Sequence, residues 1–264
     1  MCDSCLPPPP AARLMRPNRR HLLALGLGGV VLGAPLRAFA EGGAPEAAAL
    51  TGDECAPFNA GMQAVMTPDE AVERLIAGHQ RFQAGASLQC DLRAEALATA
   101  EKQTPFACIL SCIDSRVAPE LIFNQQIGDI FCARVAGNVP TTEIVGSFEY
   151  ATKVAGAKAI MVLGHSHCGA VKGAIDEAEV GDNLTDLLRL MEPAIQVTPL
   201  EGERSSHNHP FVEAVAQANV RVGVQTLLMM SAVIRELVEA GELRLVGAYY
   251  DIDTLELRLL ETGT

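Results

Sequence analysis

The sequence predicts an α/β fold in which a mostly parallel central sheet is flanked by helices. Short apolar runs at residues 106–111, 129–135 and 159–163 have the length and composition of buried strands. A helical stretch at residues 143–154 separates the last two runs, and strands that alternate with helices favour parallel pairing. With 264 residues, 49% of them hydrophobic, the chain is long enough to bury one sizeable core.

A capping box marks the start of an N-terminal helix. Thr67 is followed by Pro68 at the first helical position and by Glu70 at the third, and apolar residues then recur at helical spacing as far as Gly85. A second, polar helix is expected at residues 92–102. These helices precede the first predicted strand.

The C-terminal half continues the same pattern. A long helical region is expected at residues 211–240 and a final strand at residues 243–252. The polar stretch at residues 182–210 receives no assignment. It contains His207 and His209, which have the chemistry to bind a metal or carry protons, although an exposed loop is the favoured interpretation.

The first forty residues have the features of an export signal. Arg19 and Arg20 precede an apolar run at residues 22–35, which is short and glycine-rich for a membrane span. The run leads to a small-x-small cleavage signal that ends at Ala40. We interpret residues 1–40 as a twin-arginine-type signal peptide, the alternative being an ordinary secretory signal with a chance arginine pair.

This interpretation divides the chain into a signal, a linker or loose arm at residues 41–65, and one domain at residues 66–264. The expected location is the periplasm, where Cys55 and Cys90 are able to pair because disulfides persist in oxidising compartments. The sequence leaves that pairing open. The net charge of −12 argues against nucleic-acid binding and against stable membrane association once the signal is removed.

Eight cysteines are present, and they fall into different classes. Cys2 and Cys5 precede the apolar run and leave with the signal. Cys108 and Cys132 lie inside apolar runs, as buried small hydrophobic residues do. Apart from Cys55 and Cys90, the two that remain are Cys112 and Cys168, which belong to the motifs described next.

Two short motifs follow predicted strands: Cys112-Ile-Asp-Ser-Arg and His165-Ser-His-Cys168. Functional groups collect at the carboxyl ends of parallel strands, so both motifs are expected at one edge of the sheet. Two thiolates and one imidazole form a zinc ligand set that leaves one position free. Cys108, four residues before Cys112, lies about 13 Å away along an extended strand and is excluded.

Within the second motif, His165 and Cys168 are expected to meet through a tight turn that leads into a helix. A thiolate at a helix N-terminus is stabilised by the amide groups there, so we expect Cys168 to ionise readily. His167 is a competing ligand that is expected to face away. In the first motif, an extended chain puts Cys112, Asp114 and Arg116 on one face. Two roles are open to Asp114: the fourth zinc ligand, or a bidentate partner of Arg116 that leaves this position to water.

The sequences C-x-D-x-R and H-x-x-C-G resemble those of β-class carbonic anhydrases, over roughly residues 66–264. The similarity extends to further segments at residues 75–82, 134–138, 219–220 and 246–251. One departure is His79, where asparagine is common in that family. The resemblance implies a parallel-centred sheet with an N-terminal helical arm that wraps a partner subunit.

The resemblance also implies an activity, a cofactor and partners. The reaction is the reversible hydration of carbon dioxide to bicarbonate and a proton, by attack of zinc-bound hydroxide, with one Zn²⁺ per subunit. Cys112, His165 and Cys168 are the implied zinc ligands, and Asp114 and Arg116 the catalytic dyad. The active-site cleft lies between the subunits of a homodimer, and the sequence does not decide between a dimer and a larger assembly.

Four more residues take roles from the resemblance. Gln103 corresponds to a glutamine that hydrogen-bonds substrate in the plant-like subtype. Phe131 and Ala136 match positions that line a narrow apolar pocket, and Gly169 presents a backbone group near the substrate. His167, His207 and His209 are candidates for the proton shuttle.

Two other functions compete with this one. Some proteins of the same fold hydrolyse carbon disulfide or carbonyl sulfide, and pocket access distinguishes them. A zinc-binding module without turnover needs only the three ligands. The presence of Asp114, Arg116 and Gln103 beside those ligands favours an enzyme.

Overall fold

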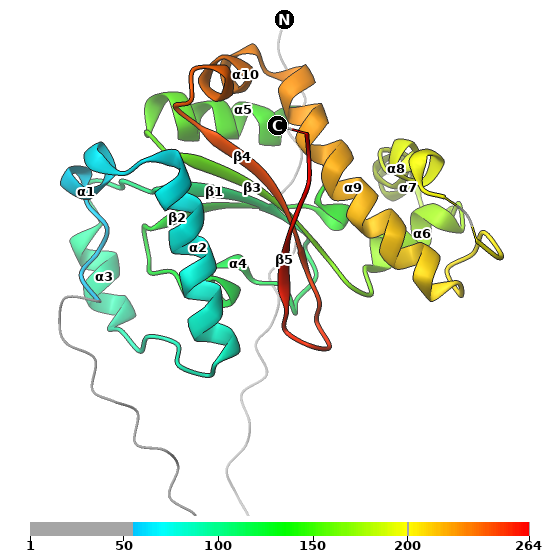
Figure 1. Ribbon diagram of the computed structural model, residues 1–264, viewed down its shortest axis with the longest axis horizontal. Helices are drawn as coiled ribbons and strands as arrows, with labels where there is room; N and C mark the ends of the chain where they lie inside the picture. Colours follow the sequence, from blue (N-terminus) through cyan, green and yellow to red (C-terminus); the bar gives the residue numbers. More distant parts are fainter. Residues whose placement is uncertain (1–54, 200, 264) are drawn as a thin grey trace, which may run out of the picture. The chain divides into compact units, whose positions relative to one another are not determined.

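A five-stranded sheet forms the centre of the computed structural model, which describes residues 55–199 and 201–263 (Figure 1). The signal predicted for residues 1–40 lies outside the described residues. The strand order is β2-β1-β3-β4-β5, and only the pairing of β4 with β5 is antiparallel. The predicted α/β fold with a mostly parallel sheet is therefore confirmed. The strands are β1 (Ala107–Ser111), β2 (Ile130–Arg134), β3 (Ala159–His165), β4 (Arg244–Tyr250) and β5 (Leu257–Leu260).

Ten α-helices and two short helical turns connect these strands in the described part of the chain. The helices are α1 (Ala60–Val65), α2 (Pro68–Gln83), α3 (Leu92–Ala98), α4 (Pro119–Ile122), α5 (Thr142–Glu149), α6 (Gly169–Ile175), α7 (Asp182–Arg189), α8 (Glu192–Val197), α9 (His209–Met230) and α10 (Ala232–Glu239). The turns are a 3₁₀ turn at Ala136–Asn138 and a π-helical turn at Tyr150–Val154 that continues α5.

Several boundaries differ from the sequence prediction. The helical region expected at residues 211–240 is divided at Ser231, whose hydroxyl accepts a hydrogen bond from Ile234 N–H (3.1 Å) and so begins α10. The unassigned polar stretch contains α7 and α8, which are short and amphipathic. Strand β5 was not predicted, because its four residues are partly exposed and carry no run of buried apolar side chains.

Helices cover both faces of the sheet, and successive residues of a strand face different helices. On one side α2 packs with α4, and Leu75 contributes to a core that includes Met161 of β3. On the other side α5, α9 and α10 pack over a core that includes Ile160 and Val162. Because both faces are buried, β1 and β3 read as continuous apolar runs.

Helix α2 begins as the sequence predicted. The Thr67 hydroxyl accepts from Glu70 N–H (3.3 Å), and the Glu70 carboxylate accepts from Thr67 N–H (2.7 Å). The helix ends before Gly85, whose φ of 68° suits glycine. The buried side of α2 packs on the sheet of its own chain, so this helix belongs to the domain core.

The described end of the expected linker is fixed to the domain as well. Cys55 and Cys90 form a disulfide with a Cα–Cα separation of 5.5 Å. The buried Asp129 carboxylate accepts hydrogen bonds from Phe58 N–H (3.3 Å) and from the Arg74 guanidinium (3.4 Å). Residues 55–65 are therefore anchored by a covalent bond and by a buried carboxylate, which composition alone does not reveal.

A buried imidazole joins α2 to two other segments. His79 is 3% exposed, its Nδ1 lies 3.2 Å from the carbonyl oxygen of Ile122, and its Nε2 lies 3.1 Å from that of Leu255. Burial lowers the pKa of His79, because removing the ring from water disfavours its charged form.

The lowered pKa predicts how stability responds to acid. The unfolded chain takes up a proton at His79 below about pH 6.5, whereas the folded chain resists it, so stability falls as the pH decreases toward the folded-state pKa. We expect His79→Gln, which keeps an amide donor and does not titrate, to lose less unfolding free energy between about pH 7.5 and about pH 5.5. Urea unfolding of both proteins in chelator gives this comparison, and equal losses would contradict the role of His79.

Candidate metal centre

Three buried side chains meet at the carboxyl edge of the sheet. The ligand atoms of Cys112, His165 and Cys168 all lie within 4.8 Å of one another. Cys112 follows β1, His165 is the last residue of β3, and Cys168 is the N-cap of α6. Strands β1 and β3 are parallel neighbours, so their carboxyl ends bring the two sequence motifs together.

His165 is oriented as a metal ligand. Its Nδ1 lies 2.8 Å from the carbonyl oxygen of Ser166, and because a carbonyl only accepts, Nδ1 carries the proton. The lone pair of Nε2 is therefore free. Among the described residues nothing pairs with this buried nitrogen, and an unpartnered buried acceptor is costly unless a ligand such as a metal ion satisfies it.

The two thiols of the cluster affect each other's ionisation. The Cys168 thiol lowers the pKa of Cys112 to about 4, with help from the N–H of Gly137, 3.4 Å from Cys112 Sγ. The same interaction, together with burial, raises the pKa of Cys168, although the amides of Val171 and Ala170 act in the opposite direction. The helix amides thus favour the Cys168 thiolate as expected, while burial and the neighbouring thiol oppose it, so a bound cation is needed to balance two thiolates here.

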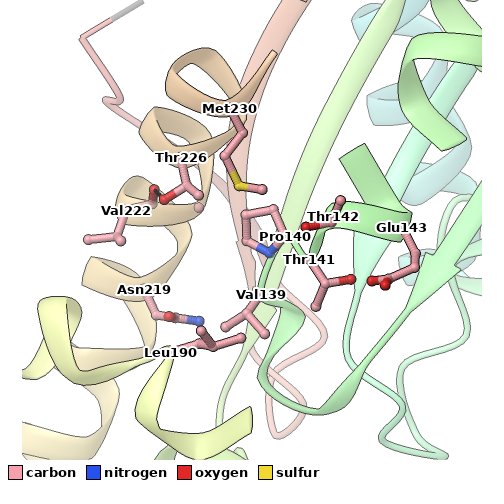
Figure 2. Close-up of a pocket in the computed structure, with 11 residues that line it drawn as sticks. Val139, Pro140, Thr141, Thr142, Glu143, Leu190, Asn219, Val222, Thr226 and Met230 are labelled. Atoms are coloured by element: carbon pink, nitrogen blue, oxygen red, sulfur yellow. Dashed lines mark hydrogen bonds between the residues drawn. The ribbon is translucent and has the colours of Figure 1, made fainter. Parts of the chain in front are cut away.

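A hydrogen-bonded relay supports Cys112 from the side of α9. The backbone of Gly137 is left-handed, with φ of 76°, and a Cβ there would lie 2.6 Å from Met191 Sδ. Asn219 donates to the Gly137 carbonyl oxygen (2.7 Å), which holds the residue whose N–H faces Cys112. Asn219 also lines a pocket together with Leu190 and other residues shown in Figure 2, and none of the three clustered ligands lines that pocket.

Asp114 is held by Arg116 through two parallel hydrogen bonds. Arg116 Nε donates to Oδ1 at 2.9 Å and a terminal nitrogen donates to Oδ2 at 2.8 Å. This guanidinium keeps the pKa of Asp114 well below its usual range. Of the two roles predicted for Asp114, the structure therefore contains the Arg116 pair, and Asp114 is not part of the Cys–His–Cys cluster.

A turn, not an extended strand, produces this pair. Strand β1 ends at Ser111, and Val117 N–H donates to the Asp114 carbonyl oxygen (2.9 Å). The Asp114 carboxylate also accepts from the backbone N–H of Arg116 (3.0 Å). The prediction of one extended face for Cys112, Asp114 and Arg116 was therefore wrong in its cause, since the local turn brings carboxylate and guanidinium together.

Arg134, at the end of β2, braces the same segment. Its Nε donates to the carbonyl oxygen of Cys112 (2.9 Å) and a terminal nitrogen donates to that of Asp114 (2.6 Å). Sequence reasoning assigned no role to Arg134, Gly137 or Asn219. The signal available for them was their presence in segments that resemble a known family.

The structure separates the four predicted substrate residues into two groups. Ala136 opens the 3₁₀ turn that contains Gly137, and Gly169 begins α6 with open space where a Cβ would lie, so both adjoin the cluster. Phe131 pairs in register with Cys108. Because Cys108 lies four residues before Cys112, Phe131 is level with a point about 13 Å from Cys112 along the strand. Gln103 is exposed and precedes β1, at the amino edge of the sheet.

The competing residues lie outside the cluster. Cys108 is fully buried, and burial raises the pKa of its thiol. His167 is 2.6 Å from an Asp253 carboxylate oxygen instead, and His207 and His209 are exposed. The described residues include no helix with the length and hydrophobicity needed to cross a membrane.

Comparison with known proteins identifies relatives of the whole domain. A family model described as carbonic anhydrase matches residues 107–257. Carbonic anhydrase 2 of Mycobacterium tuberculosis is 37% identical over 194 residues, covering 70% of this chain and 89% of the relative. The solved β-carbonic anhydrase CcaA is 28% identical with a TM-score of 0.57, covering 72% of this chain and 95% of that one. A structure of a tetrameric β-carbonic anhydrase from Sordaria macrospora is 25% identical with a TM-score of 0.55, covering 72% and 93%.

Substitutions of two cysteines distinguish a metal ligand from a thiol that only fills the hydrophobic core. We expect Cys112→Ala to reduce bound zinc at least about tenfold, because the cluster loses one of three protein ligands. Cys108→Ala is the matched control: it removes a buried thiol four residues away and keeps the zinc. Metal analysis after dialysis measures both, and equal zinc contents in the two variants would rule out this ligand assignment.

Proposed function

The chain belongs to the β-carbonic anhydrase family and catalyses the reversible hydration of carbon dioxide; we propose that it does so as an exported, zinc-dependent homodimer. The observation that carries the proposal is the buried Cys112–His165–Cys168 cluster beside the Asp114–Arg116 pair. If the purified, zinc-loaded protein hydrated carbon dioxide no faster than buffer, the proposal would fail.

Zinc fits the residues of the cluster. Two thiols and an imidazole are a typical donor set for Zn²⁺, and the free Nε2 of His165 supplies the nitrogen. The opposed pKa shifts of the neighbouring thiols Cys112 and Cys168 are consistent with a site that gains from a doubly charged cation. When bound, Zn²⁺ supplies a Lewis acid that makes water a nucleophile near neutral pH.

The protein's own groups position the reactants. Arg116 occupies both oxygens of Asp114 and keeps the carboxylate ionised, so Asp114 accepts a hydrogen bond and donates none. An acceptor fixed in this way orients the attacking oxygen and its lone pair toward substrate. Arg134 holds the backbone on which Asp114 sits. Ala136 and Gly169 are small residues beside the cluster, and a Cβ at Gly169 would meet open space.

A second copy of the chain completes the site in this proposal. Gln103 precedes β1 and Phe131 lies near the start of β2, so both are too far from the cluster of their own subunit to serve it. Strand β2 is an edge of the sheet, and Tyr150, whose ring lies 6.3 Å from that of Phe131 in β2, is 50% exposed. An unpaired edge with an exposed aromatic side chain suits an isologous dimer contact, across which Gln103 of the partner subunit reaches the cluster.

Export through the twin-arginine route is the second part of the proposal. The paired Arg19 and Arg20 before an apolar run and a small-x-small sequence support it. The Cys55–Cys90 disulfide suits an oxidising compartment. Replacing both arginines by lysine should leave the protein in the cytoplasmic fraction, and unchanged export of that variant would argue for a different route.

Substitution of Asp114 tests the positioning role. We expect Asp114→Asn to retain zinc, because Asp114 is outside the ligand cluster, and to lower the hydration rate at least about 100-fold, because the amide no longer provides an ionised acceptor. Stopped-flow hydration assays and metal analysis on the same sample separate the two effects. An unchanged rate would show that this carboxylate has no part in catalysis.

Mixing two inactive variants tests whether the site is shared. Cys112→Ala and Gln103→Ala are each expected to be nearly inactive alone. In a mixed dimer, one of the two sites has Cys112 from one subunit and Gln103 from the other, both intact. About half of the dimers are mixed after dissociation and reassociation, so about a quarter of the wild-type activity should return. Absence of any recovery, with exchange verified by mass, would mean that Gln103 acts within its own subunit or not at all.

A further inference from the structure

Residues 251–256 connect β4 to β5, and we call this segment the strap. Asp251 N–H donates to the carbonyl oxygen of Glu256 (2.9 Å), which closes the strap on itself. The Asp251 carboxylate accepts from the backbone N–H groups of Asp253 (2.9 Å) and Thr254 (3.1 Å). These bonds make the strap a preformed unit.

The strap is bonded to both residues between the ligands His165 and Cys168. Ile252 N–H donates to the Ser166 hydroxyl at 2.8 Å. The Nε2 of His167 lies 2.6 Å from Asp253 Oδ2, and since an ionised carboxylate only accepts, that nitrogen donates. The strap therefore contacts the turn that sets the spacing of two ligands.

His167 needs an anchor because its backbone is left-handed. The chain must reverse between the end of β3 and the start of α6, and it does so with φ of 57° at His167. Residues other than glycine adopt this conformation only when their surroundings impose it. A second carboxylate, Glu213 of α9, accepts from the His167 N–H at 3.2 Å.

The other end of the strap is attached to α2. The buried His79 has its Nε2 3.1 Å from the carbonyl oxygen of Leu255, a residue that is itself left-handed with φ of 60°. The strap thus extends from a buried residue of α2 to the turn between the ligands, and it is fixed at both ends.

We propose that Asp253 is a positioning residue for the metal centre, acting through His167 to hold the turn that aligns His165 with Cys168. The proposal rests on the zinc site of the proposed function. Because His167 and Asp253 are 38% and 69% exposed, the strength of their contact is limited, and its effect lies in geometry.

Zinc affinity, measured by competition with a chromophoric chelator, tests the proposal. We expect Asp253→Ala to bind zinc roughly threefold to tenfold more weakly, and Asp253→Asn to stay near wild type because its amide oxygen still accepts from His167. The control is Asp186→Ala, which removes another exposed aspartate, paired with Arg189 on α7, and should leave the affinity unchanged.

A double-mutant cycle then isolates the route through His167. Glycine adopts a φ near 57° without steric cost, so in a His167→Gly background Asp253→Ala should have no further effect. Equal losses in both backgrounds, or wild-type affinity in Asp253→Ala, would overturn the proposal. If the wild-type chain itself bound no zinc, the proposed function would fail instead.

Replacing zinc by cobalt gives an absorption spectrum that does not change when a substitution only lowers the stability of the fold. In a folded protein with intact ligands, the thiolate-to-cobalt absorption band reports the geometry of Cys112 and Cys168 around the metal. We expect this band to shift or weaken in Asp253→Ala and to recover in Asp253→Asn. An unchanged band in Asp253→Ala would contradict the positioning role.

Discussion

The parallel pairing of β1 and β3 is the constraint on which the metal centre depends. Cys112 and His165 belong to motifs that are distant in the chain, and each lies at the carboxyl end of one of these strands. Neither strand presents a ligand set alone. Buried apolar side chains on both faces of the sheet fix the register, so the hydrophobic core and the spacing of the ligands are set by the same packing.

Charge explains why the polar groups around this centre are arranged in pairs. In two neighbouring buried thiols, ionisation of one opposes ionisation of the other, so a cation is needed to stabilise both thiolates. A nearby free carboxylate would add repulsion and compete as a ligand. Arg116 prevents both effects by occupying the two oxygens of Asp114, and the low pKa of Asp114 follows from that bond. The guanidinium thus keeps the carboxylate ionised and outside the ligand cluster.

The sequence predicted the sheet and the three clustered side chains because strands buried on both faces leave a strong pattern, and because Cys and His at these spacings have few other uses. It did not predict the turn at Asp114–Val117, whose cause is local hydrogen bonding and not strand parity. It also missed Arg134 and Asn219, since contacts made by one side chain across the fold have no sequence period. The sequence also did not predict β5, because this strand has no face of buried apolar side chains.

The direction of the strands also supports the proposal that two chains form the site. Residues at the carboxyl edge of the parallel sheet lie near the metal centre. Residues at the amino edge are a strand length away and do not reach it. Gln103 and Phe131 are on the excluded side, so a substrate role for them requires a second copy with its own amino edge turned toward this centre. The segment next to Gln103 in space is the one that the disulfide and Asp129 secure, because Thr104 donates to the carbonyl oxygen of Phe58 (3.1 Å). In the proposed dimer, this fixed N-terminal segment would hold Gln103 in place for the partner, and the disulfide would support the site of the partner subunit.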